Sequence, residues 1–163
     1  MRRVGPFARL QLAIGQFASE RGVYLGRRST RIHVAIYRWT RGRLGKRVPG
    51  FPEARIALVD HVGARSGVHR TSPLIFLEDA GSVVVVASKA GQPTSPAWFH
   101  NLMAHPDTRV QVGGEVRDVR ARLAGEEERK RLYPKFVAVY PAYEFYERHA
   151  GRREIPVVIL ERR

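Results

Sequence analysis

From residue 53 onward, the chain is divided into short β-rich runs that end at turns containing glycine or proline. Six strands are predicted, over residues 55–62, 72–77, 82–88, 110–112, 115–123 and 155–161. Gly81 and the Gly113-Gly114 pair supply hairpin turns between neighbouring runs. Most intervals between strands are too short for the crossover helices of a parallel sheet. The pattern therefore predicts an antiparallel sheet that is curled into a small barrel.

Helical segments are predicted before and between these strands. Residues 6–20 form an amphipathic pattern, with Phe7, Leu10, Ile14 and Phe17 on one stripe. Further helices are expected over 30–40, with Ile32, Ile36 and Trp39 on one side, and over 96–104, 126–139 and 143–149. Ser95 is the expected N-cap of the 96–104 helix. The 126–139 helix ends either at Tyr133, because of Pro134, or at Val139. Residues 42–52 are predicted to be a basic connector. The fold class is α+β and mainly β.

The positive charge is concentrated at the N-terminus. Of the net charge of +14, residues 1–50 hold twelve Lys or Arg and one Glu, whereas the remainder is nearly balanced. We therefore divide the chain into a basic helical arm, 1–50, and a barrel domain, 51–163. Such an arm suits an anionic membrane, a nucleic acid or a polyanionic ligand, although it could also be a solvated surface.

The composition excludes several kinds of chemistry. The chain has no cysteine, so thiol nucleophiles, disulfides and iron–sulfur ligation are absent, and any redox chemistry must belong to a bound cofactor. Its six histidines show no metal-ligand spacing, and we assign no metal. No run of 18 apolar residues occurs, and we expect a cytoplasmic protein.

The segment 63–74 joins two predicted strands and carries groups that suit a phosphate. Gly63 and Gly67 let backbone amides turn toward an anion, and Arg65 and Arg70 add positive charge. The same composition is also ordinary turn chemistry.

Two further segments combine polar groups with aromatic rings. In 87–102, Ser88 and Lys89 follow a buried strand and precede a helix that holds Trp98, so hydroxyl, ammonium and helix N-terminus can converge on one ligand. Tyr140, Tyr143 and Tyr146 recur every three residues and could form the wall of an apolar pocket. Packing in the core is the alternative for both segments.

The order of these motifs resembles the deazaflavin-dependent nitroreductase family, the F420H2-dependent quinone and nitro-compound reductases. The resemblance covers residues 56–160. It rests on Gly63-Ala64-Arg65-Ser66-Gly67 with Arg70, on Ser72-Pro73-Leu74, on Val86-Ala87-Ser88-Lys89, on Pro96-Ala97-Trp98-Phe99-His100-Asn101-Leu102, on Tyr140-Pro141 with Tyr143 and Tyr146, and on Ile155-Pro156-Val157-Val158.

This resemblance implies an FMN-binding-type split β-barrel that binds coenzyme F420 and passes hydride from the reduced cofactor to a quinone or nitro-type acceptor. The residues implied around the cofactor are Ala64, Arg65, Ser66, Arg70, Thr71, Ser72, Pro73, Val86, Ala87, Ser88, Lys89, Ala97, Trp98, Phe99, His100, Asn101 and Tyr143. Ser88, Tyr140, Tyr143 and Tyr146 are implied at the acceptor. Ala64 stands where many members have a basic residue, so one contact to the anionic tail is in doubt.

Other functions remain open at this point. An F420 carrier with little turnover needs the same contacts with the cofactor. An FMN- or heme-binding split barrel would share the fold. A nucleic-acid-binding barrel is disfavoured, because the strands lack a row of exposed aromatic residues for stacking. The cationic amphipathic helix over 6–20 also predicts peripheral contact with an anionic membrane, near membrane quinone.

Overall fold

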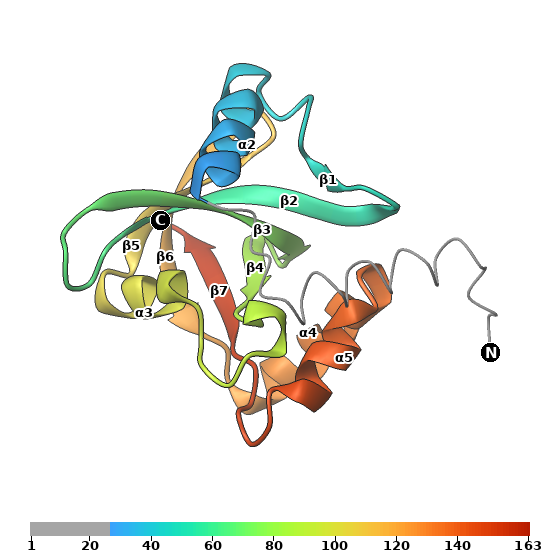
Figure 1. Ribbon diagram of the computed structural model, residues 1–163. Helices are drawn as coiled ribbons and strands as arrows, with labels where there is room; N and C mark the ends of the chain where they lie inside the picture. The colour runs from blue at the N-terminus through green and yellow to red at the C-terminus, as the bar shows by residue number, and fades with distance from the viewer. Residues whose placement is uncertain (1–26) are drawn as a thin grey trace.

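The strands of the computed structural model, which describes residues 27–163, close into an antiparallel barrel (Figure 1). They are β1 (Arg47–Val48), β2 (Phe51–Val62), β3 (His69–Asp79), β4 (Ser82–Val86), β5 (Asp107–Val112), β6 (Glu115–Leu123) and β7 (Val157–Arg162). The order is β1-β2-β3-β4-β7-β6-β5, and all pairs are antiparallel. Pairing of Leu58 with Gln111 and of Val59 with Val110 joins β2 to β5 and closes the barrel. The predicted mainly β barrel is confirmed.

The four consecutive valines of β4 show how the barrel is built. Val83 and Val85 lie in the interior cluster with Phe76, whereas Val84 and Val86 belong to a second cluster outside the barrel. Side chains alternate between the two faces of a strand, so a continuous apolar run is needed where both faces are covered.

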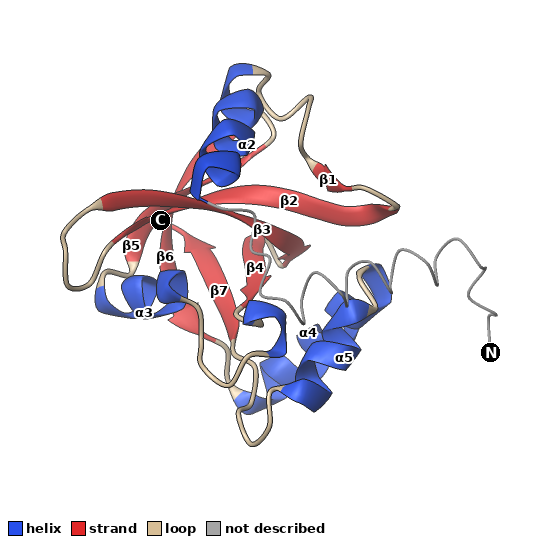
Figure 2. Cartoon of the chain, viewed as in Figure 1, coloured by secondary structure: helices blue, strands red, loops and turns tan. Residues whose placement is uncertain are grey.

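Helices cover two sides of the barrel (Figure 2). Helix α3 (Ala97–Ala104) contributes Trp98 and Leu102 to the interior cluster. Helices α4 (Glu126–Val139) and α5 (Ala142–His149) cover the outer face of β4 and β7 and supply the aromatic side chains of the second cluster. α4 continues through Pro134 to Val139, and Pro134 itself is exposed. Among the described residues, no helix is long and apolar enough to cross a membrane.

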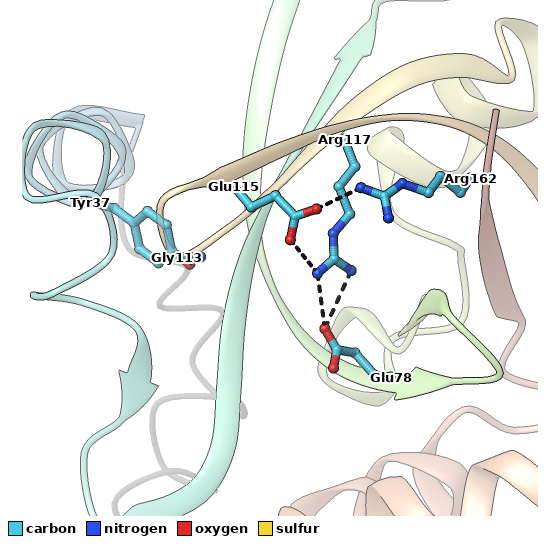
Figure 3. A network of polar contacts seen from close by, with 6 residues as sticks. All are labelled: Tyr37, Glu78, Gly113, Glu115, Arg117 and Arg162. Carbon is cyan, nitrogen blue, oxygen red and sulfur yellow. Dashed lines mark hydrogen bonds and ion pairs between the residues drawn. The ribbon is translucent and has the colours of Figure 1, made fainter.

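Helix α2 (Arg27–Trp39) lies outside the barrel and is attached to it through Tyr37. The buried Tyr37 hydroxyl donates to the Ile56 carbonyl at 2.9 Å. It also accepts the Gly113 amide at 2.9 Å, and Figure 3 shows these two residues. By contrast, Ile32, Ile36 and Trp39 are exposed. The predicted 30–40 helix is confirmed, and its apolar side faces away from the core.

Some predicted boundaries are wrong. The connector assigned to 42–52 contains β1 and the first residues of β2, and the last strand begins at Val157 because Pro156 cannot donate to the sheet. Ser95 is not the cap of α3: Pro96 holds that position and no side chain caps the helix. The predicted 6–20 helix lies outside the described residues, and the division at residue 50 stays a prediction.

Candidate functional site

The loop between β2 and β3 is closed by its own backbone. Gly67 donates to the Gly63 carbonyl at 2.8 Å, and Gly63 donates to Val68 at 2.9 Å. Gly67 has φ +66°, and a side chain at Gly63 would collide with the Ser66 hydroxyl. A larger residue at Gly63 would require the Ser66 side chain to move, whereas Gly67 adopts a conformation that other residues reach only with strain.

Two predicted tail-binding cations lie in or next to this loop. Arg65 and Arg70 are exposed, and within residues 27–163 neither guanidinium is held by a carboxylate. The Ser66 hydroxyl accepts the Val68 amide at 3.4 Å. The loop thus presents uncompensated positive charge, which suits an anionic ligand.

A buried polar network lies beneath the loop and was missed from the sequence. Asn101 of α3 accepts the Ala64 amide at 2.9 Å, and its amide nitrogen lies 2.9 Å from His61 Nδ1. His61 Nε2 lies 3.0 Å from the Ser72 hydroxyl. His61 and its neighbours therefore join three predicted residues from different segments of the chain, namely Ala64, Ser72 and Asn101. Strand alternation could have identified His61, because it continues the inward-facing series of Ala57 and Val59.

Burial keeps His61 neutral. Its pKa is lowered from 6.5 to about 4, mainly because burial removes water from the charged form and also because Arg70 is near; Asp60 acts in the opposite direction. His61 is thus a neutral hydrogen-bonding group in a folded protein at neutral pH.

Thr71 lies on the other face of β3. Its hydroxyl donates to Asp60 at 2.6 Å and accepts from Arg38 of α2 at 3.1 Å, and Arg38 also contacts Asp60 at 2.8 Å. These contacts attach α2 to the barrel. The predicted contact of Thr71 with the cofactor stays a prediction, and the structure does not bring this hydroxyl to the His61 network.

The loop after β4 has an unusual backbone that is held by Arg153. Lys89 and Ala90 have φ of +47° and +53°, a region that side chains rarely adopt. The Arg153 guanidinium donates to the carbonyls of Ser88 at 2.8 Å, Gln92 at 2.8 Å and Ala87 at 3.1 Å. Arg153 lies more than 60 residues from these carbonyls, and no local sequence signal marks it.

This loop also places Lys89 beside α5. Lys89 Nζ donates to the Thr94 hydroxyl at 2.7 Å and, among described residues, is in no ion pair. A side chain at Gly91, whose φ is +76°, would lie 2.9 Å from the Tyr146 carbonyl. Only glycine permits this close approach between the lysine loop and the tyrosine helix.

The three predicted acceptor tyrosines form one aromatic cluster. The Tyr143 ring centroid is 5.6 Å from that of Tyr140 and 5.9 Å from that of Tyr146, and both pairs are edge-to-face. Burial raises the pKa of Tyr140 and of Tyr143, and the neighbouring phenols raise both further. Both are therefore neutral hydrogen-bond donors at physiological pH. Tyr143 is almost wholly buried.

The other predicted residues are divided among the strands and α3. Val86 lies in the outer cluster and Ala87 in the interior one, as alternation requires. Trp98 is buried in the barrel, whereas Ala97 and His100 are exposed. Most of the predicted residues thus fall into two groups, the 63–72 loop region with Asn101 and the 86–91 loop with the tyrosines, while Thr71 lies on the opposite face of β3. Within residues 27–163, no three potential metal ligands cluster.

Comparison with known proteins shows what this chain is similar to. Residues 29–162 match the family model described as F420H(2)-dependent quinone reductase. A relative named F420H(2)-dependent quinone reductase from Mycobacterium tuberculosis is 36% identical over 149 residues, which cover 86% of this chain and 94% of that protein.

Further similarity comes from a second relative and a solved structure. A protein named putative F420H(2)-dependent quinone reductase from M. tuberculosis is 40% identical and covers 65% of this chain and 88% of that protein. A structure titled F420-H2 dependent reductase (FDR-A) is 40% identical and superposes with a TM-score of 0.60, covering 65% of this chain and 93% of that one. The chain belongs to the F420H(2)-dependent quinone reductase family.

Proposed function

We propose that this protein is a reductase that binds coenzyme F420 and transfers hydride from its reduced form to a quinone-like acceptor. The observation that carries the proposal is the uncompensated charge of Arg65, Arg70 and Lys89 in a chain of this family. By contrast, Arg117 and Arg131 lie in ion pairs near the turn between β3 and β4. Three cations on two loops suit the phosphate and glutamyl tail of F420, and FMN offers only a single phosphate.

The protein's own contribution is to bind, orient and exclude water. When bound, reduced F420 supplies the hydride, and the chain has no cysteine that could take part in redox chemistry. The 63–67 loop and Lys89 hold the anionic tail, while Val86, Ala87 and Ser88 line the ring system. Tyr140, Tyr143 and Tyr146 surround the acceptor with apolar rings and hydroxyl donors. A donor that bonds more strongly as the acceptor gains negative charge stabilises the transition state.

Turnover separates a reductase from a carrier. Reduced F420 is mixed with a soluble quinone analogue under anaerobic conditions, and the return of oxidised-cofactor fluorescence is followed with and without the protein. We expect oxidation that saturates with quinone and scales with protein. Tight binding of F420 without acceleration would instead indicate a carrier. A nitro compound tested in the same assay decides whether the acceptor range extends beyond quinones.

We also propose peripheral contact with an anionic membrane, supported by the outer side of α2. Ile32, Ile36 and Trp39 are 60%, 40% and 85% exposed and recur at helical spacing. Arg28 and Arg31 on the same helix are exposed and, among residues 27–163, in no ion pair. An exposed apolar stripe beside cations is the pattern of helices that lie at a lipid surface. The stripe predicted over residues 6–20 would add to the same attraction.

Vesicle binding tests the membrane proposal. Full-length protein should sediment with phosphatidylglycerol vesicles at low salt and not with phosphatidylcholine vesicles. Trp39→Ser and deletion of residues 1–25 should each weaken sedimentation and leave turnover of a soluble quinone nearly unchanged. Leu123→Ser, which alters an exposed apolar residue elsewhere, is the matched control. If full-length protein ignores anionic vesicles at low salt, or if the truncated protein loses F420 binding, the membrane proposal is wrong.

A further inference from the structure

His61 and Asn101 are the two buried polar residues of the described chain, with 5% and 7% of their surfaces exposed. They lie on β2 and α3 and meet beneath the 63–67 loop. Buried polar groups are costly unless each finds a partner, so this pair needs an explanation beyond packing. The proposed function assigns no task to His61.

The hydrogen bonds fix the orientation of both side chains. A backbone amide can only donate, so the Ala64 amide at 2.9 Å requires the oxygen of Asn101 to face the loop. The amide nitrogen of Asn101 therefore faces His61 Nδ1, also at 2.9 Å. That nitrogen can only donate, so Nδ1 must be unprotonated and must accept. The neutral imidazole then carries its proton on Nε2 and donates it to the Ser72 hydroxyl at 3.0 Å.

We propose that His61 is a positioning residue that, through Asn101, holds the anion-binding loop in place for F420. The inference rests on the proposed function, because its consequence is measured as cofactor binding. We call the hydrogen-bonded series from Ser72 through His61 and Asn101 to the Ala64 amide the relay. Ala64 is followed directly by Arg65. The exposed side chain of Arg65 binds an anion more tightly when its backbone is already ordered. With Nδ1 as acceptor, the Asn101 amide is fixed at both its oxygen and its nitrogen; without that acceptor, the Ala64 amide alone holds it in this orientation.

The surroundings of His61 favour this state. Arg70 on β3 disfavours a positive charge on the imidazole, Asp60 on β2 favours one, and the contacts from α3 and β3 are Asn101 and Ser72. A proton on Nδ1 would set two donors against each other. Rotation of the amide would only transfer this conflict to the Ala64 amide, because the nitrogen of Asn101 would then face a backbone donor.

The tautomer of His61 can be measured without any cofactor. Nitrogen chemical shifts of the imidazole in isotope-labelled full-length protein at pH 7 should show a neutral ring that is protonated at Nε2. A ring protonated at Nδ1, or a doubly protonated ring, would overturn the relay. Asn101→Asp offers Nδ1 an acceptor instead of a donor, so in that variant we expect the proton to appear on Nδ1.

Paired substitutions test whether the relay acts on the loop. His61→Phe fills the space and removes the acceptor, and we expect it to weaken F420 binding about tenfold, which is about 1.4 kcal/mol. His61→Asn keeps an acceptor oxygen one bond beyond Cγ, where Nδ1 lies, and should stay within about threefold of the wild type. In an Arg65→Ala background, His61→Phe should cost less than about twofold, because the loop no longer carries that cation.

The controls separate positioning from general destabilisation. His105→Ala, an exposed histidine just beyond α3, should bind F420 like the wild type. Equal losses in His61→Phe and His61→Asn, or full additivity with Arg65→Ala, would overturn the proposal. Thermal unfolding identifies a variant that does not fold. In that case, the tautomer measurement on wild type and Asn101→Asp decides whether His61 and Asn101 are hydrogen-bonded as described. If wild type fails to bind F420, the proposed function is wrong, and the tautomer still shows whether Asn101 is held as described.

Discussion

The two ends of the β3–β4 hairpin differ in whether their positively charged side chains are paired with carboxylates. At the turn end, Arg117 donates to Glu115 at 2.7 Å and to Glu78 at 3.3 Å, and Arg162 reaches Glu115 at 2.7 Å (Figure 3). Arg131 of α4 adds a pair to Asp79 at 2.6 Å. We call this the ion-paired end. Away from the turn, Arg65 and Arg70 in and next to the β2–β3 loop and Lys89 after β4 are in no ion pair among the described residues, and we call these two loops together the open end.

This difference distinguishes charge that serves the fold from charge that is available to a ligand. Within the ion-paired end, hydrogen bonding to Arg131 lowers the pKa of Asp79 to about 2, and hydrogen bonding to Arg117 lowers the pKa of Glu115. At the open end, the conformation of the loops is instead fixed by glycine turns and by the hydrogen bonds from Arg153 to backbone carbonyls. Net charge alone does not reveal this, because both ends are rich in arginine.

The largest effect is expected on the chemical step at the open end. Ser88→Ala and Tyr143→Phe remove hydroxyl donors proposed to stabilise the reduced acceptor, and each should lower the rate of quinone reduction by roughly 10- to 1000-fold. Binding of F420 should change much less. Steady-state rates and fluorescence titrations measure the two quantities separately. Arg117→Ala at the ion-paired end serves as the control, and a comparable loss of rate there would remove the distinction between the ends.

The two ends should also lose stability at different pH. His61 has a pKa of about 4 in the folded protein and 6.5 when unfolded, so the unfolded chain binds the proton first as the pH falls. The free energy of unfolding should therefore decrease by about 3 kcal/mol between pH 6.5 and pH 4. Asp79 of the ion-paired end, with a pKa of about 2 in the folded protein and 3.8 when unfolded, loses its contribution only below that range. Urea titrations of wild type and His61→Asn measure this, and an unchanged slope in the variant would contradict it.

Substitution of Arg153 tests whether the order of the loop after β4 or its charge determines F420 binding. Arg153→Ala leaves the carbonyls of Ser88 and Gln92 without their donor and releases the strained Lys89–Ala90 backbone. We expect F420 affinity to fall about 30-fold, which is about 2 kcal/mol. The neighbouring Arg152→Ala removes one charge without these contacts and is the matched control. Equal effects of the two substitutions would mean that charge, not order, determines binding at this loop.

Most of the fold could be predicted from the sequence, because strand alternation and glycine turns are local signals. The buried valines of β4, the hairpin at Gly113-Gly114 and helix α4 follow directly from such patterns. The site was less accessible. Arg153 acts on carbonyls more than 60 residues away, and the roles of Asn101 and His61 depend on which side chains meet beneath the loop. Residue type cannot show whether an arginine has found a carboxylate.

The smallest effects are expected from single cations of the open end. Arg70→Ala and Lys89→Ala should each weaken F420 binding about 3- to 10-fold, as expected for partly exposed charge pairs. Both variants should keep the unfolding temperature of the wild type. Arg131→Ala, which breaks an exposed ion pair at the other end, should leave F420 affinity unchanged. A loss of folding in Arg70→Ala or Lys89→Ala would show that these side chains stabilise the barrel.

Fluorescence titration of the purified protein with F420, with FMN as the comparison ligand and at several salt concentrations, tests the central claim most directly. The account predicts that F420 binds more tightly than FMN and that its affinity falls as salt rises and as the glutamate tail is shortened, because the open end binds the tail through exposed charge. Equal affinity for F420 and FMN, or an F420 affinity that does not respond to salt, would contradict it.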